Sequence, residues 1–155
     1  MAKLSLKELA QNFEKYADQE VSVCGWVRTI RDSKSFAFIE LNDGTYFKST
    51  QIIADESKLE NYKSVISQNV GAGLSVVGKV ALTPQMKQPF EIQAKSIEIE
   101  ATSTPTYPLQ KKRHTMEYLR EIAHLRPRAN TFQAVFRVRS VAAQAIHAFF
   151  ASRNF

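Results

Sequence analysis

The fold is decided by residues 20–53, which read EVSVCGWVRTIRDSKSFAFIELNDGTYFKSTQII. From Glu20 onward, apolar and β-branched residues recur with a period of two, which is typical of a half-buried strand. Gly25 inside the first run predicts a bulge or a sharp bend. The Asn-Asp-Gly sequence at 42–44 predicts a hairpin-type turn between the second run, 35–41, and a third that starts at Thr45. These residues therefore predict a meander of three strands, the first of them curved.

The segments on either side of these strands predict the remaining helices and strands of the domain. A capping box at Ser5 and Glu8 predicts a helix over residues 5–18. A second helical pattern covers 56–69, and alternating segments at 74–82 and 90–99 predict two further strands. Five strands with one internal helix between the third and fourth favour an OB-fold, a Greek-key barrel, over an ordinary sandwich. The expected fold is therefore mainly β, a five-stranded OB-fold barrel behind an N-terminal helix, and we assign this domain to residues 1–100.

The composition changes after residue 100. Residues 101–112 begin with Ala-Thr-Ser-Thr-Pro-Thr-Tyr-Pro and predict a hinge. Residues 113–155 predict a helix over 114–123, an Arg-Pro-Arg break, and a long helix capped by Asn130 and Gln133. The apolar face of this last helix is too wide for one helix to bury, so we expect it to need a partner. The sequence reads as if it stops inside a second domain.

Composition excludes several classes of protein. The 155 residues are 44% hydrophobic and 23% charged, which is typical of a globular chain. The sequence contains no apolar run long enough for a membrane span and no signal-peptide block, so we expect a cytoplasmic protein without a membrane partner. A single cysteine, Cys24, excludes an internal disulfide. The three histidines lack zinc-ligand spacing, so no metal site is expected.

The net charge of +6 lies entirely in the last third of the chain. Residues 1–100 carry 12 basic and 13 acidic side chains, whereas residues 101–155 carry 9 basic and 2 acidic ones. Such asymmetry is found in proteins that bind polyanions, but a solvated basic helix face produces it equally well. Charge alone therefore leaves both interpretations open.

No catalytic arrangement is recognisable in the sequence. Gly71-Ala72-Gly73 is too short for a phosphate-binding loop, and no nucleophile elbow is present. We interpret His114, His124 and His147 as surface or helix-face residues rather than bases or ligands. No catalytic residue is therefore predicted.

The second strand instead suggests a binding surface. Phe36, Phe38 and Glu40 point to one side of it, and an aromatic pair followed by a carboxylate is unusual for a core. Exposed rings on a barrel can stack on unpaired bases. The alternative is that both phenylalanines pack under the N-terminal helix. The opposite side of the strand is a plain core row, which consists of Ala37, Ile39 and Leu41.

Polar residues on neighbouring strands fit the same interpretation. Arg28 and Arg31, near the end of the first strand, can hold phosphates or stack on bases. Gln51 on the third strand has both a donor and an acceptor, as reading a base edge requires. Glu91 on the fifth strand is an acceptor that repels phosphate, so it favours base reading over nonspecific binding.

Three strings of residues carry a resemblance to a known family. They are GWVRTIRDSKSFAFIELNDG at 25–44, FEIQA at 90–94 and YPLQKKRHTMEYLREIAHLRPRAN at 107–130. Together they resemble the asparaginyl-tRNA synthetases, and the GWV, RD and phenylalanine-strand features are shared with the aspartyl and lysyl enzymes of the same class II subclass. The resemblance covers essentially all 155 residues. It implies an N-terminal OB-fold that binds the tRNA anticodon, a hinge, and the start of a class II catalytic domain.

The resemblance also implies roles for individual residues. In the family, an aromatic residue on strand two stacks on the central anticodon uridine, which matches Phe38. A glutamine on strand three, here Gln51, reads the edge of that base, and a glutamate on strand five, here Glu91, contacts a neighbouring base. An arginine of the GWVxxxRD string, matching Arg31, also contacts the anticodon. Weaker candidates are Arg28, Gln85 and Lys87.

For the full-length parent, the resemblance implies an asparagine–tRNA ligase. Such an enzyme uses ATP and magnesium to form an aminoacyl-adenylate, transfers asparagine to its tRNA, and works as a homodimer. The helix at 130–153 resembles the leading part of motif 1, which contributes to the dimer interface. Motifs 2 and 3, which carry the ATP and amino-acid contacts, are absent. We therefore expect the 155 residues alone to be inactive and to bind no cofactor.

Two other functions remain open at this stage. An aspartyl-tRNA synthetase that also accepts the asparagine tRNA would have similar anticodon-binding residues. A stand-alone OB-fold that binds single-stranded nucleic acid would have the same barrel. The core-type helix at 130–150 argues against this second alternative, because a solvent-exposed nucleic-acid arm should be polar.

Overall fold

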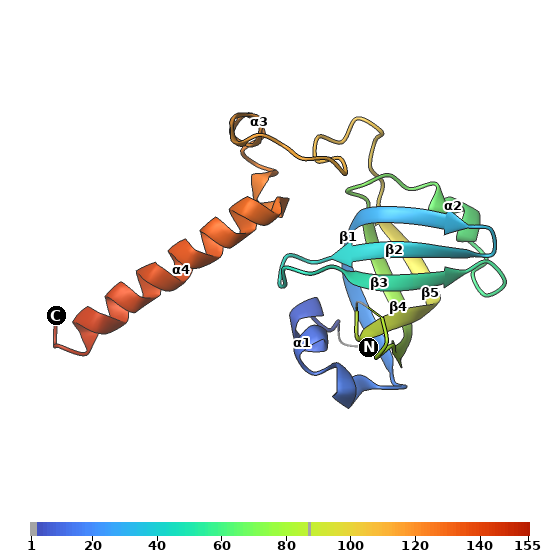
Figure 1. The fold of residues 1–155 in the computed structure, drawn as a ribbon, viewed down its shortest axis with the longest axis horizontal. Helices are drawn as coiled ribbons and strands as arrows, with labels where there is room; N and C mark the ends of the chain where they lie inside the picture. The colour runs from blue at the N-terminus through green and yellow to red at the C-terminus, as the bar shows by residue number, and fades with distance from the viewer. Residues whose placement is uncertain (1–2, 87) are drawn as a thin grey trace. The chain divides into compact units, whose positions relative to one another are not determined.

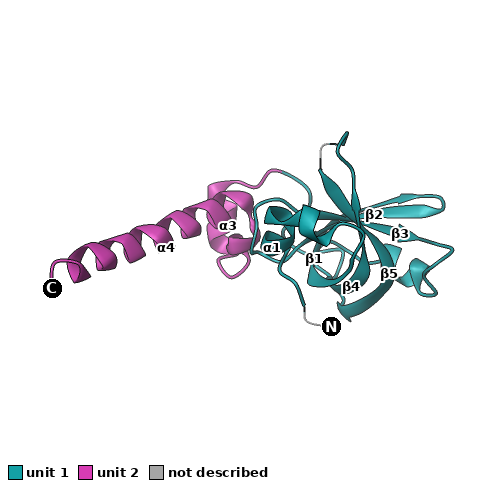
Figure 2. Ribbon diagram, turned by 90° about the horizontal axis from the view of Figure 1, so that it is seen from below, with its two compact units in different colours: residues 1–112 teal, residues 113–155 magenta. Residues whose placement is uncertain are grey.

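The computed structural model describes residues 3–86 and 88–155. They form two compact units, residues 1–112 (teal in Figure 2) and residues 113–155 (magenta). Among the described residues, no helix is both long and apolar enough to cross a membrane.

The first unit is built around a closed barrel of five strands, as the sequence predicted (Figure 1). Its order is β1-β2-β3-β5-β4, and β4 pairs back onto β1 to close it. All neighbouring strands are antiparallel except β3 and β5, which run parallel. The strands are β1 (Glu20–Ser33), β2 (Phe36–Asn42), β3 (Thr50–Asp55), β4 (Gly73–Leu82) and β5 (Phe90–Ala101).

Strand β1 is long because it serves two neighbours in turn. Its first half pairs with β4 and its second half with β2, and Trp26 has a partner in each. Gly25 lies at this change of partner, where a Cβ atom would come within 2.4 Å of the carbonyl oxygen of Asn42. Of the two predicted alternatives at Gly25, a bulge or a sharp bend, the bulge is not there, because the irregular register lies between Val27 and Thr29. Gly25 instead allows the close approach of β2, and Arg28 is the extra residue of the bulge.

The turn after β2 is longer than predicted. Strand β3 begins at Thr50 rather than Thr45, which leaves a loop over residues 43–49. Its first residue, Asp43, accepts hydrogen bonds from the amide and hydroxyl of Thr45 at 2.9 and 2.7 Å. The other oxygen of Asp43 accepts from the backbone N–H of Leu6 at 2.8 Å. The loop is thus held against the N-terminal helix. A two-residue turn would be too short to make this contact.

The N-terminal helix is also shorter than the predicted 5–18. Helix α1 (Leu6–Gln11) is capped by Ser5, whose hydroxyl accepts from Glu8 N, as the capping box predicted. It ends at Asn12, whose side-chain amide donates to Glu8 Oε1 at 3.0 Å, and the chain continues as the 3-10 helix η1 (Phe13–Tyr16). This tighter turn places the Phe13 ring on Phe90, with centroids 5.5 Å apart.

The second helix lies between β3 and β4, on the opposite side of the barrel from α1 (Figure 1). Helix α2 (Tyr62–Ile66) is only the end of the predicted 56–69, because Asp55 accepts from the N–H and hydroxyl of Ser57 and holds residues 55–57 in a turn. Leu59, Tyr62 and Val65 join the barrel interior. One hydrophobic core therefore connects both helices with inward residues of all five strands.

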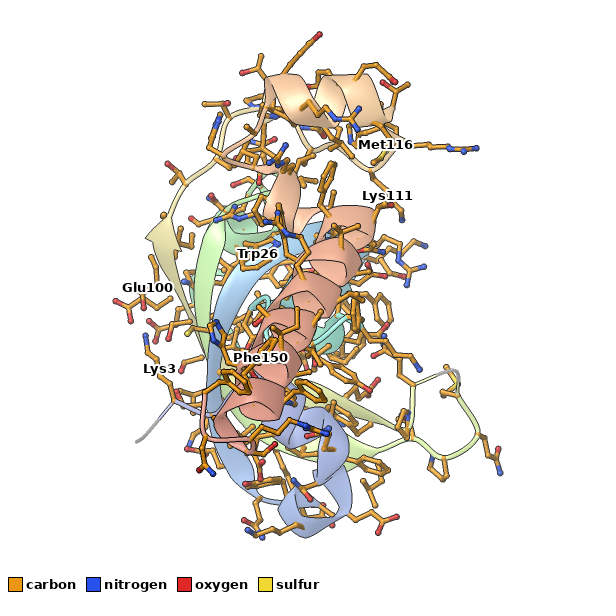
Figure 3. The ribbon with its side chains drawn as sticks, turned by 90° about the vertical axis from the view of Figure 1, so that its left-hand side faces the viewer. Lys3, Trp26, Glu100, Lys111, Met116 and Phe150 are labelled. Carbon is orange, nitrogen blue, oxygen red and sulfur yellow. The ribbon has the colours of Figure 1, made fainter. Side chains whose placement is uncertain are left out.

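The segment predicted as a hinge lies partly against the barrel. Asn69 Nδ2 donates to the carbonyl of Ser103 at 2.9 Å. Gly71, with φ of +91°, lies so close to the ring of Tyr107 that a Cβ atom would be 2.8 Å from it. Next to this segment, Lys3 Nζ lies 3.4 Å from Glu100 Oε1 near the end of β5 (Figure 3). The first unit therefore continues past the last strand to residue 112.

The second unit is helical. Arg126 lies over the rings of Phe132 and Phe136, 5.0 and 5.5 Å from their centroids. The predicted cap of the long helix is wrong, because Ala129 is the N-cap residue without a side-chain cap and Asn130 is already helical. The elements are α3 (Met116–Glu121), capped by Thr115, the 3-10 helix η2 (Arg126–Arg128) and α4 (Asn130–Ala151).

Asp43 should contribute to stability through the helix it caps. The substitution Asp43→Ala removes an acceptor from the first turn of α1 and should lower the free energy of unfolding by about 0.5–2 kcal/mol. Asp43→Asn keeps one oxygen acceptor and should lose less. Urea unfolding of the three proteins measures the difference. Equal losses for alanine and asparagine would contradict a capping role.

Tyr62 should make stability depend on pH in the alkaline range. Burial and the hydrogen bond to Asp32 Oδ1, 2.9 Å long, raise the pKa of Tyr62 to about 12, above the usual value of about 10. The unfolded chain loses this proton first, so the stabilisation is complete below about pH 10 and is lost as the pH rises through about 12. The melting temperatures of the parent and Tyr62→Phe should therefore converge as the pH rises from about 10 to about 12. A constant gap would contradict this assignment.

Candidate functional site

The two faces of β2 separate the core from a solvent-facing surface, as predicted. Ala37, Ile39 and Leu41 are completely buried, whereas Phe36 is 44% exposed. Phe38 and Glu40 are half-buried and share the outward direction of Phe36. Neither Phe36 nor Phe38 belongs to the hydrophobic core or to the side chains packed against it. The alternative in which these rings pack under α1 is therefore excluded, and Phe13 is the phenylalanine that lies near that helix.

An arginine accompanies the central aromatic ring. Arg31 on β1 and Phe38 on β2 are cross-strand partners. The guanidinium carbon of Arg31 lies 5.6 Å from the ring centroid, within the range of a cation–π contact. On the other side, Ile53 of β3 is the cross-strand partner of Phe38. The ring therefore has a cation on one flank and an apolar side chain on the other, which is a suitable platform for a flat ligand.

A second row, beside the first, carries the polar groups. Glu40 on β2 faces Gln51 on β3. The side-chain nitrogen of Gln51 donates to Glu91 Oε2 on β5 at 3.3 Å. This hydrogen bond orients the amide, and the oxygen Oε1 of Gln51 is then an acceptor that a ligand can use. Gln51 and Glu91, which are 40 positions apart, are thus brought together as one polar unit.

The charges on this face differ from one end to the other. Arg31 is exposed beside the aromatic ring, whereas the carboxylates of Glu40 and Glu91 lie beside Gln51. A phosphate is attracted to the first end and repelled by the second. Base edges, which offer amine and imino protons, suit the carboxylate end. The arrangement therefore favours reading of unpaired bases with the backbone held at the arginine side.

The remaining predicted residues lie elsewhere. Arg28 is the extra residue of the β1 bulge and so stands outside the rows of cross-strand pairs. Gln85 is exposed on the loop that joins β4 to β5. Lys87, on the same loop, lies outside the described residues. The structure brings Arg31 to Phe38 and Gln51 to Glu91.

One residue of this region was missed from the sequence. Gln88 Oε1 accepts a hydrogen bond from the backbone N–H of Gln51 at 3.2 Å, and Gln88 Nε2 donates to the carbonyl of Ser49 at 3.4 Å. It lies in the loop between β4 and β5 that also carries the predicted residues Gln85 and Lys87. No local pattern shows which residue of that loop folds back onto β3.

The site has no sign of metal chemistry. Among the residues that the structure describes, no group of three or more His, Cys, Asp or Glu side chains is placed to hold a metal ion. The outer face consists of an aromatic ring, a cation, an amide and two carboxylates, which can stack on a flat ligand and hydrogen-bond to it.

The barrel and this face define a class of protein. Residues 21–100, more than half of the chain, match the family model of the tRNA anticodon type described as the OB-fold nucleic acid binding domain. The chain belongs to this family of OB-fold nucleic acid binding domains.

Particular relatives are similar over the whole chain. The asparagine–tRNA ligase of Clostridium kluyveri is 57% identical over 155 residues, which are all of this chain and 33% of that protein. The asparagine–tRNA ligase of Alkaliphilus oremlandii is 56% identical over the same share of each chain. The chain thus spans about a third of the length of these curated relatives. These identities confirm the resemblance found in the three sequence strings.

Solved structures agree on the fold. The asparaginyl-tRNA synthetase of Pyrococcus horikoshii with asparaginyl-adenylate has a TM-score of 0.86 at 17% identity, over 98% of this chain and 35% of that one. A structure described as a putative aspartyl-tRNA synthetase from Leishmania major Friedlin has a TM-score of 0.83 at 20% identity, over 99% of this chain and 33% of that one. At these identities the likeness establishes the fold alone.

The opposite faces of β2 should respond differently to truncation. Phe38→Ala should leave the melting temperature nearly unchanged and weaken binding of single-stranded RNA by about 1–3 kcal/mol, because one stacking contact is lost. Ile39→Ala should lower the free energy of unfolding by about 2–5 kcal/mol, because it opens a cavity in the core. Thermal unfolding and RNA titration of both variants test this. A large loss of stability in Phe38→Ala would place that ring in the core instead.

Proposed function

We propose that this chain is the anticodon-recognition part of an asparagine–tRNA ligase. The observation that carries the proposal is the outer face of the barrel, where a ring flanked by a cation lies beside a coupled glutamine and glutamate. The relatives that are 56 to 57% identical over the whole chain bear this enzyme's name and support the same assignment.

Each side chain has a role that follows from its chemistry. Phe38 stacks on the central anticodon uridine, and Arg31 beside it holds a phosphate or extends the stack. Gln51 presents Oε1 to the imino proton of that uracil, which cytosine lacks. Glu91 accepts a hydrogen bond from a neighbouring base while it also accepts one from the amide of Gln51. In this proposal, accessory contacts to the tRNA backbone are made by Arg28, Gln85 and Lys87.

The chemistry of the full-length ligase lies outside this face. In such an enzyme ATP and magnesium supply the activation of asparagine, and the anticodon-recognition part contributes tRNA selection. The described residues contain no group suited to hold a metal ion, and in this proposal both cofactors bind to other parts of the full-length protein. That the 155 residues alone do not aminoacylate tRNA stays a prediction, as does a cytoplasmic location.

A homodimer of the full-length protein is part of the proposal. Helix α4 has many exposed apolar side chains, and Phe150, labelled in Figure 3, is 49% exposed. Val138 and Val141 on the same helix are 69% and 66% exposed. Exposed apolar area of this kind is typical of surfaces that other protein covers. It supports an assembly through α4.

An aspartyl-tRNA synthetase that accepts both tRNAs is the nearest alternative. Aspartyl enzymes are among the structural neighbours, and the barrel alone does not separate the two. A stand-alone single-strand-binding module is less well supported, because the relatives extend well beyond this length.

Stem-loop binding tests the proposal. Three anticodon stem-loops are compared at one moderate salt concentration, because phosphate contacts depend on salt. The first reads GUU, the second GCU, and the third reads GUC as in the aspartate tRNA. We expect the tightest binding to GUU, and a loss of about tenfold or more for GCU, which corresponds to one base contact.

The other outcomes discriminate among the alternatives. Equal binding of GUU and GUC, with GCU rejected, would favour a protein that accepts both tRNAs. Equal binding of all three with a steep salt dependence would reduce the function to nonspecific electrostatic binding by a basic chain. Gln51→Ala should remove the preference for uridine over cytidine and leave most of the stacking energy in place.

A further inference from the structure

Strands β3 and β5 are joined by a short ladder. Only Ile52 with Ile92 and Ile53 with Gln93 are paired, in parallel. Continuing the same register would place Phe90 opposite Thr50, but the ladder stops before that point. The shortest strand pairing of the barrel therefore lies directly beside Gln51, the residue that reads the base in the proposed function.

The side chain of Gln88 extends the β3–β5 ladder by one further position. Its oxygen accepts from Gln51 N and its nitrogen donates to the carbonyl of Ser49, at 3.2 and 3.4 Å. In a parallel ladder, one residue bonds in this way to the two residues that flank its partner. A glutamine amide has the donor and acceptor of a peptide group. The Gln88 side chain thus stands opposite Thr50 as a residue of β5 would.

The loop holds Gln88 in this place. The carbonyl of Gln88 accepts from the hydroxyl of Thr83 at 2.8 Å, and Thr83 N donates to the carbonyl of Pro89 at 2.8 Å. Gln88 itself is half-buried, in contrast to its exposed neighbours Gln85 and Pro89. The bonds at the base of the loop hold the backbone of Gln88, and its amide is held by Gln51 and Ser49.

Gln51 is consequently held at two points from the same side. Gln88 holds its backbone, and Glu91, three residues further along, holds its side-chain amide. With both bonds in place, Oε1 of Gln51 keeps one direction before any ligand arrives. Such preorganisation increases affinity and selectivity because the ordering cost is not incurred on binding.

We infer that Gln88 is a positioning residue for base recognition, which acts through Gln51 and does not itself read the base. This inference rests on the proposed function. It accounts for a hydrogen-bonded side chain in a loop where the sequence had assigned contact roles only to Gln85 and Lys87.

A double-mutant cycle tests the inference. Gln88→Ala should reduce affinity for the GUU stem-loop about tenfold, the equivalent of one hydrogen bond, and reduce affinity for GCU much less. In the Gln51→Ala background, Gln88→Ala should have no further effect on the ratio of the two affinities. Gln88→Glu keeps the acceptor for Gln51 N but loses the donor, so it should fall between the parent and alanine.

Gln68→Ala is the matched control. Gln68 also donates its side-chain amide to a backbone carbonyl, that of Ser64, but this bond lies at the end of α2 and does not involve β3. This variant should leave both affinities unchanged. If Gln88→Ala weakens both stem-loops equally, or lowers the ratio further in the Gln51→Ala background, then Gln88 contacts RNA directly and the inference is wrong.

Hydrogen exchange separates this inference from the proposed function. In the RNA-free chain, Gln88→Ala should speed exchange of the Gln51 backbone amide, while Ile53 N, within the paired ladder, should exchange as in the parent. If the parent shows no preference for GUU, the proposed function fails, and this exchange measurement still tests the positioning. An unchanged Gln51 exchange rate would overturn it.

Discussion

Closure of the five-stranded barrel is the constraint on which the rest of the structure depends. Because β3 must meet β5 to close the ring, every strand has one face that is sealed from water and one that is not. The alternation along β2 then has only one solution, with Ile39 inside and Phe38 outside. A shift of one residue would bury a carboxylate and expose the core row. The binding face is therefore a direct consequence of the packing of the core.

Closure also determines which residues meet. Arg31 and Phe38 are joined by an antiparallel hairpin, a local contact. Gln51 and Glu91 meet only because β3 and β5 close the ring, and the antiparallel pairing of β4 and β5 carries the loop that contains Gln88 to the same place. The aromatic half of the face is thus built by strands that are neighbours in sequence. The polar half is built where β3 and β5 meet to close the barrel. In the proposed function, stacking and base reading therefore rest on different parts of the fold.

The loops, the helix caps and the bulge modify the barrel locally and do not change its topology. The loop after β2 is lengthened to reach α1, where Asp43 satisfies a backbone N–H that the helix leaves free. Arg28 is the extra residue of a bulge two positions after Trp26, where β1 changes its partner from β4 to β2. The bulge is an irregularity within β1, and the loop after β2 is bonded to α1. The two predicted long helices are shortened by other, local side-chain hydrogen bonds, from Asn12 to Glu8 and from Ser57 to Asp55, which compete with helix formation.

The sequence by itself determined the strand order, the inward and outward parity of β2, and the family. These depend on alternation and on motifs, which are local and visible in a single chain. Only the tertiary structure decided that Gln88 supports Gln51 across 37 positions, that the bulge lies at Arg28 rather than near Gly25, and that Asp43 caps a distant helix. Each of these is a hydrogen-bonding or register choice between segments that meet only after the barrel closes. No pattern within either segment records the partner, because the partner's position is a product of folding.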